Sequence, residues 1–241
     1  KPTLSRERGM HTYTLSLWIE LVGILLIALL WFATVRMVQQ DYEDELQAAF
    51  RTQATLARAM DLQVQEVLND ADGVLLAMKQ SQETRGNITA ELRQALEISN
   101  LAKFAAQASV LDTKGNFFFS FRPVQPNTNL ADRAQFRAHV DRDTGTYFIG
   151  PAVQGRVSGV PSFHISRRIN NADGSFGGVV SLALQTRYFT EIFLKITQEP
   201  RNFFLFGRDG LIRATDDEFA GLIGKSLKER PVFEKIEMNP L

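Results

Sequence analysis

Two consecutive arginines stand in a segment whose other large residues are mostly apolar. Residues 163–169 read FHISRRI, and side chains along a β-strand alternate between its two faces. The alternation places Arg167 with the apolar side chains and Arg168 with the polar ones. A guanidinium among apolar neighbours is costly unless a carboxylate pairs with it. That carboxylate could come from a bound molecule or from the protein, where Asp132 is the candidate partner for either arginine.

A second group of chemically active side chains lies in residues 131–142, ADRAQFRAHVDR, a pattern that predicts a short helix. Arg133, Phe136 and His139 follow one another at steps of three and therefore share one side of that helix. His139 and His164 are too few, and lack carboxylates at suitable spacing, to predict a metal site. We interpret each as an ordinary core or surface histidine.

The composition and the motifs exclude several kinds of chemistry. The 241 residues include no cysteine, which excludes disulfides, thiolate zinc sites and cysteine nucleophiles. Lys and Arg total 27, as do Asp and Glu, and this zero net charge argues against nucleic-acid binding. Residues 221–226, GLIGKS, end like a phosphate-binding loop, but Phe219 stands where that motif needs its first glycine. We therefore predict no catalytic residue, no metal, no cofactor and no enzymatic activity for this chain.

Residues 17–35, LWIELVGILLIALLWFATV, carry one charge, Glu20, and a tryptophan near each end. A helix of this length spans about 28 Å, close to the hydrocarbon thickness of a bilayer. We predict a transmembrane helix over 15–36, with a cleaved signal peptide or a buried soluble helix as the alternatives. Basic residues precede the segment and acidic residues follow it. By the positive-inside rule, 1–14 is cytoplasmic and the chain from about Val38 onward lies outside the cytoplasm.

Residues 37–84 predict a long stalk helix. Apolar or small residues, with Gln53 as the one polar exception, recur there at alternating steps of four and three, the heptad pattern of a coiled coil, although its alanines weaken the pattern. We expect this seam to pack on a partner helix near the membrane, giving a dimer, and on the chain's own sheet farther along. A monomeric helix that packs only on its own domain is the alternative. The seam consists of Leu46, Phe50, Gln53, Ala57, Met60, Val64, Val67, Ala71, Val74 and Met78.

Beyond the stalk the pattern changes to short strands and helices, which predict an α+β fold with central antiparallel sheets. Residues 85–199 are interpreted as one α+β unit, the membrane-distal one. Residues 203–215 repeat its opening hairpin pattern about 95 positions later, so 200–241 is interpreted as the start of a truncated, membrane-proximal unit of the same kind. We expect the chain to be part of a longer protein. The distal unit is predicted to contain a hairpin over 109–121, the helix over 131–142, strands over 147–153, 162–169 and 176–185, and a helix from Thr186.

The distal unit contains an ordered set of motifs: DRAQFRAH at 132–139, IGP at 149–151, GRVSG at 155–159, SRRI at 166–169, DGSFGGVV at 173–180 and a closing helix at 187–189. Together they resemble the double Cache sensor domains of bacterial membrane receptors, which are tandem PAS-like (PDC) units on a long helix. On this resemblance, 85–199 is a PAS-like sensor unit and 200–241 is the start of a second one. The variant is most similar to the sensor regions of membrane-bound diguanylate cyclases and of some histidine kinases. One departure is Val160-Pro161, where the family often has Trp.

The resemblance implies that a small organic ligand, a carboxylate or an amine, binds between the sheet and a cover in the distal unit. The cover would be 132–139 and 150–159, and the floor would be 163–169 and 179–185. Arg156, in a glycine-flanked loop, is otherwise interpreted as a solvated or capping residue. The ligand-binding residues expected on this basis are Arg133, Phe136, His139, Tyr147, Arg156, Ser166, Arg167, Arg168 and Gln185.

On the same resemblance, the chain is expected to be the periplasmic or extracellular sensor region of a signal-transduction protein of a bacterial inner membrane. Ligand state would pass through a dimeric stalk to a cytoplasmic output domain, expected to be a diguanylate cyclase beyond Leu241. The alternatives are the sensor of a histidine kinase or chemoreceptor, and a ligand-free, membrane-anchored dimerisation module. An anchored enzyme that uses Asp132, His139 and Arg167 is a further hypothesis, which no spacing rule supports. The expected partners are the ligand, the membrane and a second copy of the chain, without nucleic acid.

Overall fold

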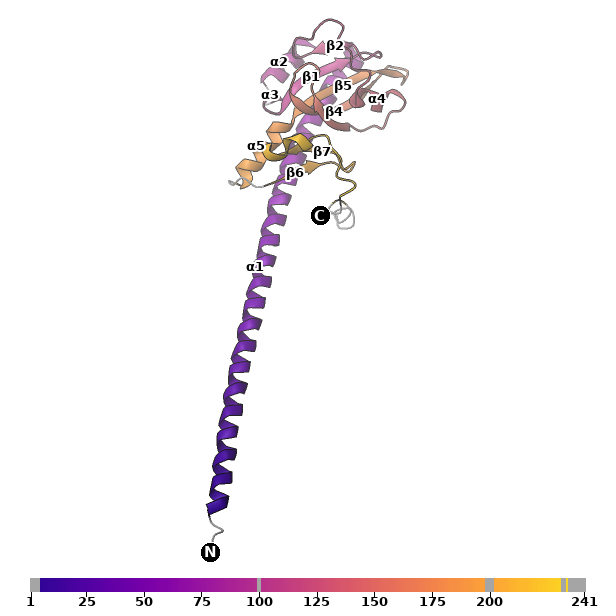
Figure 1. Cartoon of the computed structure of the whole chain (residues 1–241). Helices are drawn as coiled ribbons and strands as arrows, with labels where there is room; N and C mark the ends of the chain where they lie inside the picture. Colours follow the sequence, from indigo (N-terminus) through magenta and orange to yellow (C-terminus); the bar gives the residue numbers. More distant parts are fainter. Residues whose placement is uncertain (1–4, 99–100, 198–201, 231–232, 234–241) are drawn as a thin grey trace. The chain divides into compact units, whose positions relative to one another are not determined.

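The computed structural model describes residues 5–98, 101–197, 202–230 and 233 (Figure 1). The chain divides into two compact units, Lys1–Ala57 and Arg58–Leu241, and helix α1 (Ser5–Arg85) contributes residues to both. The second unit contains a five-stranded antiparallel sheet and several short helices. The predicted fold class is confirmed: an α+β protein with a long N-terminal helix and a central antiparallel sheet.

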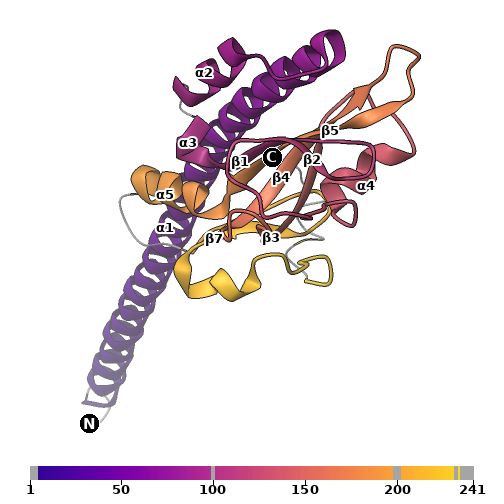
Figure 2. The same ribbon diagram turned by 90° about the horizontal axis from the view of Figure 1, so that it is seen from above.

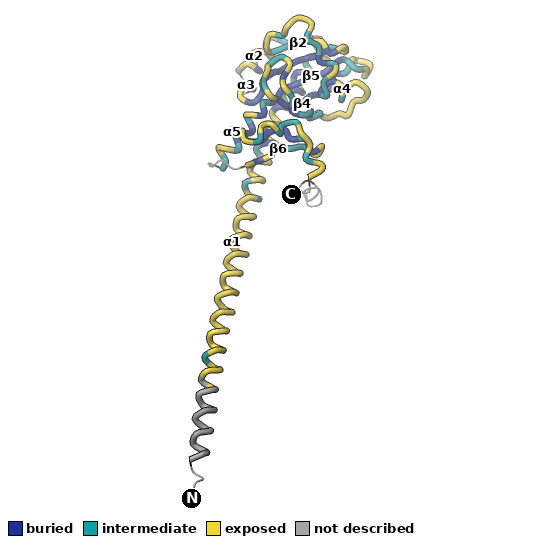
Figure 3. The backbone as a smooth tube through the Cα atoms, in the orientation of Figure 1, coloured by how far each residue is buried: buried dark blue, intermediate teal, exposed yellow. Residues whose placement is uncertain are grey.

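In the first unit, α1 is apolar and exposed. From Glu20 to Ala57 its side chains are exposed at nearly every position (Figure 3). Among the described residues, α1 is the one helix long and apolar enough to cross a bilayer, with a mean hydropathy of 2.4 in its most apolar window. Apolar side chains exposed to water are unfavourable, and a bilayer is the surrounding that fits this length and composition. The predicted orientation across a membrane remains a prediction.

Five strands form the central sheet of the second unit, in the order β2-β1-β5-β4-β3 with every neighbouring pair antiparallel. The predicted hairpin is confirmed as β1 and β2, and its turn contains Gly115 at φ 82°, a backbone conformation that favours glycine. The order of the strands and the course of α1 alongside them can be followed in Figure 2. The strands are β1 (Ala105–Leu111), β2 (Phe117–Ser120), β3 (Phe148–Gln154), β4 (Pro161–Asn170) and β5 (Phe176–Gln185).

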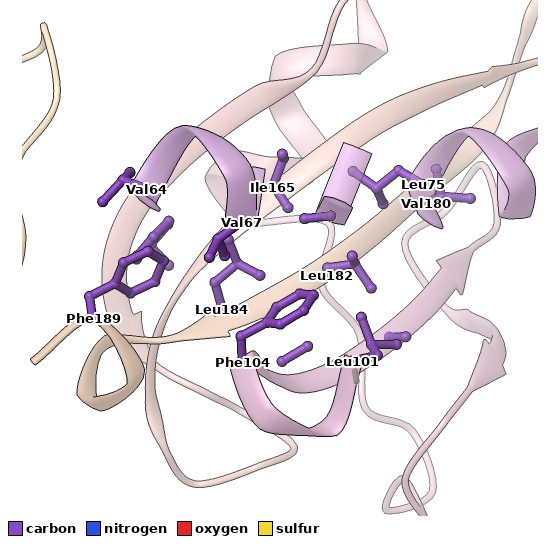
Figure 4. Close-up of a cluster of buried hydrophobic side chains, with 14 of the residues drawn as sticks. Val64, Val67, Leu75, Leu101, Phe104, Ile165, Val180, Leu182, Leu184 and Phe189 are labelled. Carbon is purple, nitrogen blue, oxygen red and sulfur yellow. The ribbon is translucent and has the colours of Figure 1, made fainter. Parts of the chain in front are cut away.

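The part of α1 in the second unit packs on one face of this sheet. Its buried residues recur with the period of a straight α-helix, about 3.6 residues, which keeps them on one face toward the sheet. A strict heptad pattern has a shorter period, so its residues drift around a straight helix by about 20° per repeat. Leu75 is fully buried and Val74 only partly, which corrects the predicted seam at that position. The stripe packs with Leu182 and Leu184 of β5 (Figure 4). It consists of Met60, Val64, Val67, Ala71, Leu75 and Met78.

Short helices complete the second unit. Helices α2 (Ala90–Ile98) and α3 (Leu101–Phe104) precede β1. Helix α5 (Thr186–Thr197) follows β5, as predicted, and buries Phe189 with its ring centroid 5.2 Å from that of Phe163.

Helix α4 (Ala134–Val140) lies on the sheet face opposite α1. A separate apolar cluster there joins Phe136 of α4 to Leu111 and Val179 of the sheet. The helix is shorter than the predicted 131–142 because Arg133 has an extended backbone (φ −79°, ψ 145°) and Asp141 is the C-cap.

The second predicted hairpin is present as β6 (Phe204–Phe206) and β7 (Ile212–Thr215), which pair antiparallel. The 3₁₀-helix η1 (Asp217–Leu222) follows, and the Asp216 carboxylate caps it by accepting from Phe219 N. The predicted boundary between the two PAS-like units lies outside the described residues, so that division of the chain remains a prediction.

Candidate functional site

Three rows of side chains cross β1, β5 and β4 on the sheet face that is turned away from α1. Strand pairing gives the rows as Gln107–Ala183–His164, Ser109–Ser181–Ser166 and Leu111–Val179–Arg168. The central residues of the first two rows, Ala183 and Ser181, are too small to fill the space above the sheet. In the third row, Leu111 and Val179 pack with Phe136 and leave no such space.

A cavity of about 20 Å³ lies over the small residues of this face, which is little more than the space of one water molecule. Its floor is formed by Gln107, Ser109, His164 and Ala183. The loop of its cover turns back on itself, because Gly155 N donates to Val160 O at 3.1 Å and Gly159 N donates to Gly155 O at 3.0 Å. The cover consists of Phe117, Leu130, Arg133, Gln135 and residues 155–158.

Several buried polar atoms on this sheet face lack hydrogen-bond partners. Within the described part of the chain they are Gln107 Oε1, His164 Nδ1, Ser181 Oγ and His139 Nδ1. Gln107 Nε2 donates to Ser120 Oγ, whose own proton goes to a backbone carbonyl, so Oε1 is the acceptor left unused. A buried polar group without a partner costs about 1–3 kcal/mol. This face therefore has unused hydrogen-bonding capacity for water or for a ligand.

The imidazole of His164 is neutral at pH 7 and makes no hydrogen bond to any described residue. Burial lowers its pKa to about 4, and the positive charge of Arg133 acts in the same direction. A neutral imidazole offers one donor and one acceptor. Arg133 has no carboxylate partner in the described structure, since its guanidinium donates only to Gln154 O, at 3.5 Å.

Asp132 pairs with Arg156, which corrects the expectation of an ion pair with Arg167 or Arg168. Two guanidinium nitrogens of Arg156 each lie 2.8 Å from a carboxylate oxygen of Asp132, and one of them also donates to Asn129 O at 2.6 Å. The hydrogen bond from Arg156 lowers the pKa of Asp132. The two side chains are 38% and 62% exposed, so the pair adds little stability, but it fastens the cover loop and neutralises Arg156.

His139 and Ser166 fasten α4 to β4 without bordering the cavity. His139 Nε2 lies 3.0 Å from Ser166 Oγ, and Ser166 donates to Gln135 O at 3.1 Å. Because the hydroxyl has a single proton, His139 must donate, which assigns its neutral Nε2–H tautomer. Burial lowers the pKa of His139 as well. These two side chains thus position the cover of the cavity.

Neither arginine of β4 borders the cavity. Arg168 is on the same sheet face, but its Nη1 donates to His139 O at 2.5 Å and to Val140 O at 3.0 Å, which satisfies carbonyls at the end of α4. Arg167 is on the α1 face, where its Nε and Nη2 donate to the Asp72 carboxylate at 2.5 and 2.9 Å. Asp72 is therefore the carboxylate that an arginine among apolar neighbours requires.

The remaining predicted residues lie around the cavity rather than on it. Phe136 packs edge-on against Phe176 at 5.6 Å between ring centroids, Tyr147 packs beside Arg167, and Gln185 pairs with Ser162 at the end of β5. Of the predicted set, Arg133 and Arg156 line the cavity. His164 and Ala183 lie within the segments 163–169 and 179–185 that were expected to form the floor, although neither was predicted as an individual ligand-binding residue. Gln107 and Ser109 of β1 lie outside the expected floor. The signal that could have found them is a run of small and polar residues inside strongly apolar strands.

Protonation of His164 is expected to make the protein less stable in mild acid. Its pKa in the folded protein, about 4, is below the ordinary value of 6.5, so the unfolded chain takes up the proton first as the pH falls. The stability contribution is therefore fully present above about pH 6.5 and is lost between there and about pH 4. Denaturant unfolding of the wild type and of His164→Gln should show the wild type losing about 2 kcal/mol more between these pH values. Equal losses in both proteins would contradict a buried neutral His164.

No protein-family model matches the chain, and no curated protein matches it. Solved structures do share its fold. The extracellular domain of a proposed histidine kinase, rpHK1S-Z16, superposes with a TM-score of 0.65 at 23% identity over 75% of each chain. The ligand-binding domain of the Pseudomonas fluorescens chemoreceptor CtaA, in complex with L-serine, gives a TM-score of 0.55 at 18% identity over 71% of this chain and 73% of that one. The ligand-binding domain of Pseudomonas aeruginosa PAO1 PctB, in complex with L-Arg, gives 0.52 at 18% identity over 68% of each chain. The chain therefore shares the fold of these extracellular and ligand-binding domains.

Proposed function

We propose that this chain is the extracytoplasmic sensor region of a membrane-bound signal-transduction protein and that the cavity of its distal unit binds a small carboxylate. The observation that carries the proposal is the cavity itself. It lies between a sheet and a helix-and-loop cover, and two arginines and several unpartnered polar atoms surround it. The fold shared with extracellular ligand-binding domains supports the same function.

The charges around the cavity favour an anion. Arg133 and Arg156 both line it, and none of the described Asp or Glu residues does. Asp132 neutralises Arg156, whereas Arg133 has no acidic partner among the described residues. A carboxylate beside Arg133 would complete a charge-assisted hydrogen bond, the stronger kind inside a protein.

Strand β4 supplies a route from the cover to α1. Ser166 and Arg168 hold α4 on one face of the strand, and Arg167 holds Asp72 of α1 on the other. At the end of the strand, Lys79 of α1 donates to Arg168 O at 2.8 Å. A ligand that displaces α4 would therefore shift a strand bonded to α1, and the response can be as large as the ligand's preference for one arrangement.

The topology and the output of the parent protein belong to the same proposal. The apolar part of α1 would cross the membrane, with 1–14 in the cytoplasm and 85–241 outside it as two PAS-like units. The part of the seam near the membrane includes Leu46 and Phe50, which are exposed. It would pack on the same helix of a second copy of the chain. A diguanylate cyclase is the proposed output domain. A parent protein that is a histidine kinase or a chemoreceptor, with this chain as its sensor, is equally compatible with the fold.

A ligand-free dimerisation module is the second candidate, and the small size of the cavity favours it. A space of about 20 Å³ admits a water molecule and excludes an organic acid unless the cover moves. In that case the unpartnered atoms would be hydrated, and no metabolite would stabilise the protein.

The two candidates are separated by ligand-induced stabilisation of the full chain in lipid nanodiscs. We expect at least one carboxylate from a metabolite library to raise the unfolding temperature. Arg133→Met should weaken the binding of that compound at least tenfold, since a hydrogen bond to a charged group contributes about 1.5–3 kcal/mol. Arg137→Met is the matched control, because Arg137 is an exposed arginine of α4, the helix that Arg133 directly precedes. A library without any hit, or equal binding by both variants, would favour the ligand-free module or a different site.

A further inference from the structure

We infer that the cavity selects a short-chain hydroxycarboxylate and discriminates against the α-amino acid of the same carbon skeleton. This inference rests on the proposed sensor function and adds the chemical class of the ligand. It starts from three features of the described residues at the cavity: an arginine without an acidic partner, a polar cross-strand row, and a lining without carboxylates.

The lining disfavours an ammonium group. A buried ammonium needs a carboxylate or several neutral acceptors to replace its water. Asp132, the carboxylate that pairs with the lining residue Arg156, already accepts two hydrogen bonds from it. The unpaired charge of Arg133 adds repulsion. An α-amino acid would therefore gain binding free energy from the contact between its carboxylate and Arg133. It would lose binding free energy by burying its ammonium group without a carboxylate partner.

The polar row fits a hydroxyl group. Gln107 and His164 flank Ala183 on neighbouring strands, about 10 Å apart at the backbone, and the alanine methyl leaves the space between them open. Gln107 Oε1 is an unused acceptor, and the neutral imidazole of His164 offers a donor and an acceptor. One hydroxyl can donate to the amide oxygen and accept from the imidazole at once. An acid that lacks the hydroxyl leaves both groups unpaired.

The ligand reaches this row only if the cover moves outward. The closed cavity of about 20 Å³ is too small for an acid of even a few heavy atoms. The cover loop is held by the exposed Asp132–Arg156 pair, which contributes little to stability. Opening therefore breaks weak surface contacts, and the free energy of ligand binding can offset it.

The test compares three matched series on the full chain in lipid nanodiscs, with affinities measured by titration calorimetry. Each series contains a hydroxy acid, its deoxy analogue and its amino analogue: glycolate, acetate and glycine; L-lactate, propionate and L-alanine; L-malate, succinate and L-aspartate. We expect the hydroxy acid of at least one series to bind at least tenfold more tightly than its two analogues. This factor corresponds to one buried polar group left unpaired, about 1–3 kcal/mol.

Variants of His164 test whether the preference for the hydroxy acid comes from the Gln107–Ala183–His164 row. In His164→Phe the ratio of hydroxy-acid to deoxy-acid affinity should fall to about one, while the deoxy acid binds as before. His164→Gln, which restores a donor and an acceptor, should recover part of the ratio. If the phenylalanine variant does not fold, Gln107→Met removes the acceptor at the other end of the row. The ratio of hydroxy-acid to deoxy-acid affinity should then also fall to about one.

The outcomes separate this inference from the sensor function beneath it. An amino acid that binds as tightly as its hydroxy analogue overturns the hydroxycarboxylate class and leaves the sensor standing. The same conclusion follows if no member of the three series binds but the wider library yields a ligand that depends on Arg133. If neither the series nor the library binds, the sensor function itself is wrong.

Discussion

Replacing Leu75 by alanine is expected to lower the free energy of unfolding by about 3 kcal/mol. Leu75 is fully buried where α1 packs on the sheet, in one cluster with Val180 and Leu182 of β5 (Figure 4). Truncation removes apolar burial and leaves a cavity that a helix fixed against a sheet cannot close. Denaturant unfolding monitored by circular dichroism measures the change.

Leu76 provides the matched control because it is the next residue on the same helix and is 44% exposed. Leu76→Ala should change stability by no more than about 0.5 kcal/mol, as surface substitutions do. Equal losses for the two variants would contradict the helix face assigned to the core. A large loss at Leu76 alone would place that side chain in a contact with another chain.

Replacing Asp72 by asparagine is expected to lower the free energy of unfolding by about 3 kcal/mol. The change leaves the Arg167 guanidinium, whose side chain is 13% exposed, without its carboxylate. Its other contacts, to Gly145 O at 3.1 Å and beside the Tyr147 ring, do not neutralise the charge. Because the pair joins α1 to β4, the variant should also weaken any ligand response that passes between them.

Two further variants test whether the loss of stability comes from breaking the Asp72–Arg167 ion pair. Asp70→Asn removes a carboxylate from the exposed side of α1 and should be nearly neutral. The double variant Asp72→Leu with Arg167→Met removes both charges and should regain most of the stability, since well-packed apolar residues can replace a buried ion pair. A double variant no more stable than Asp72→Asn would mean that the loss comes from packing rather than from the uncompensated charge.

The strands and helices could be predicted because their signals are local. The hairpin of β1 and β2 follows from two apolar runs around Gly115, and the faces of β4 follow from alternation over residues 163–169. That alternation also predicted that Arg167 needs a carboxylate. It could not identify Asp72, which lies 95 positions away in the sequence, because nothing local sets which turn of α1 lies over which residue of β4.

The cavity could be predicted in part, in its cover and in two of the strands of its floor. Arg133 and Arg156 were expected from motifs, and both line it. Two strands of the floor, 163–169 and 179–185, were expected, but the individual residues under the cavity were not. A cavity is a lack of side-chain volume, and small residues such as Ala183 and Ser181 inside a strand are only a weak sequence signal. Only the register of β1, β5 and β4 places Gln107 and His164 on either side of Ala183.

The sequence by itself determined the fold class, the apolar N-terminal helix and the alternation of β4, since periodicity and turn chemistry act over a few neighbouring residues. The tertiary structure decided the partners: Asp72 for Arg167, Asp132 for Arg156, and the C-terminal end of α4 for Arg168. It also decided where the sheet is hollow. Charge pairing and cavity formation depend on distances between segments that are remote in the chain, and those distances exist only after the sheet has formed.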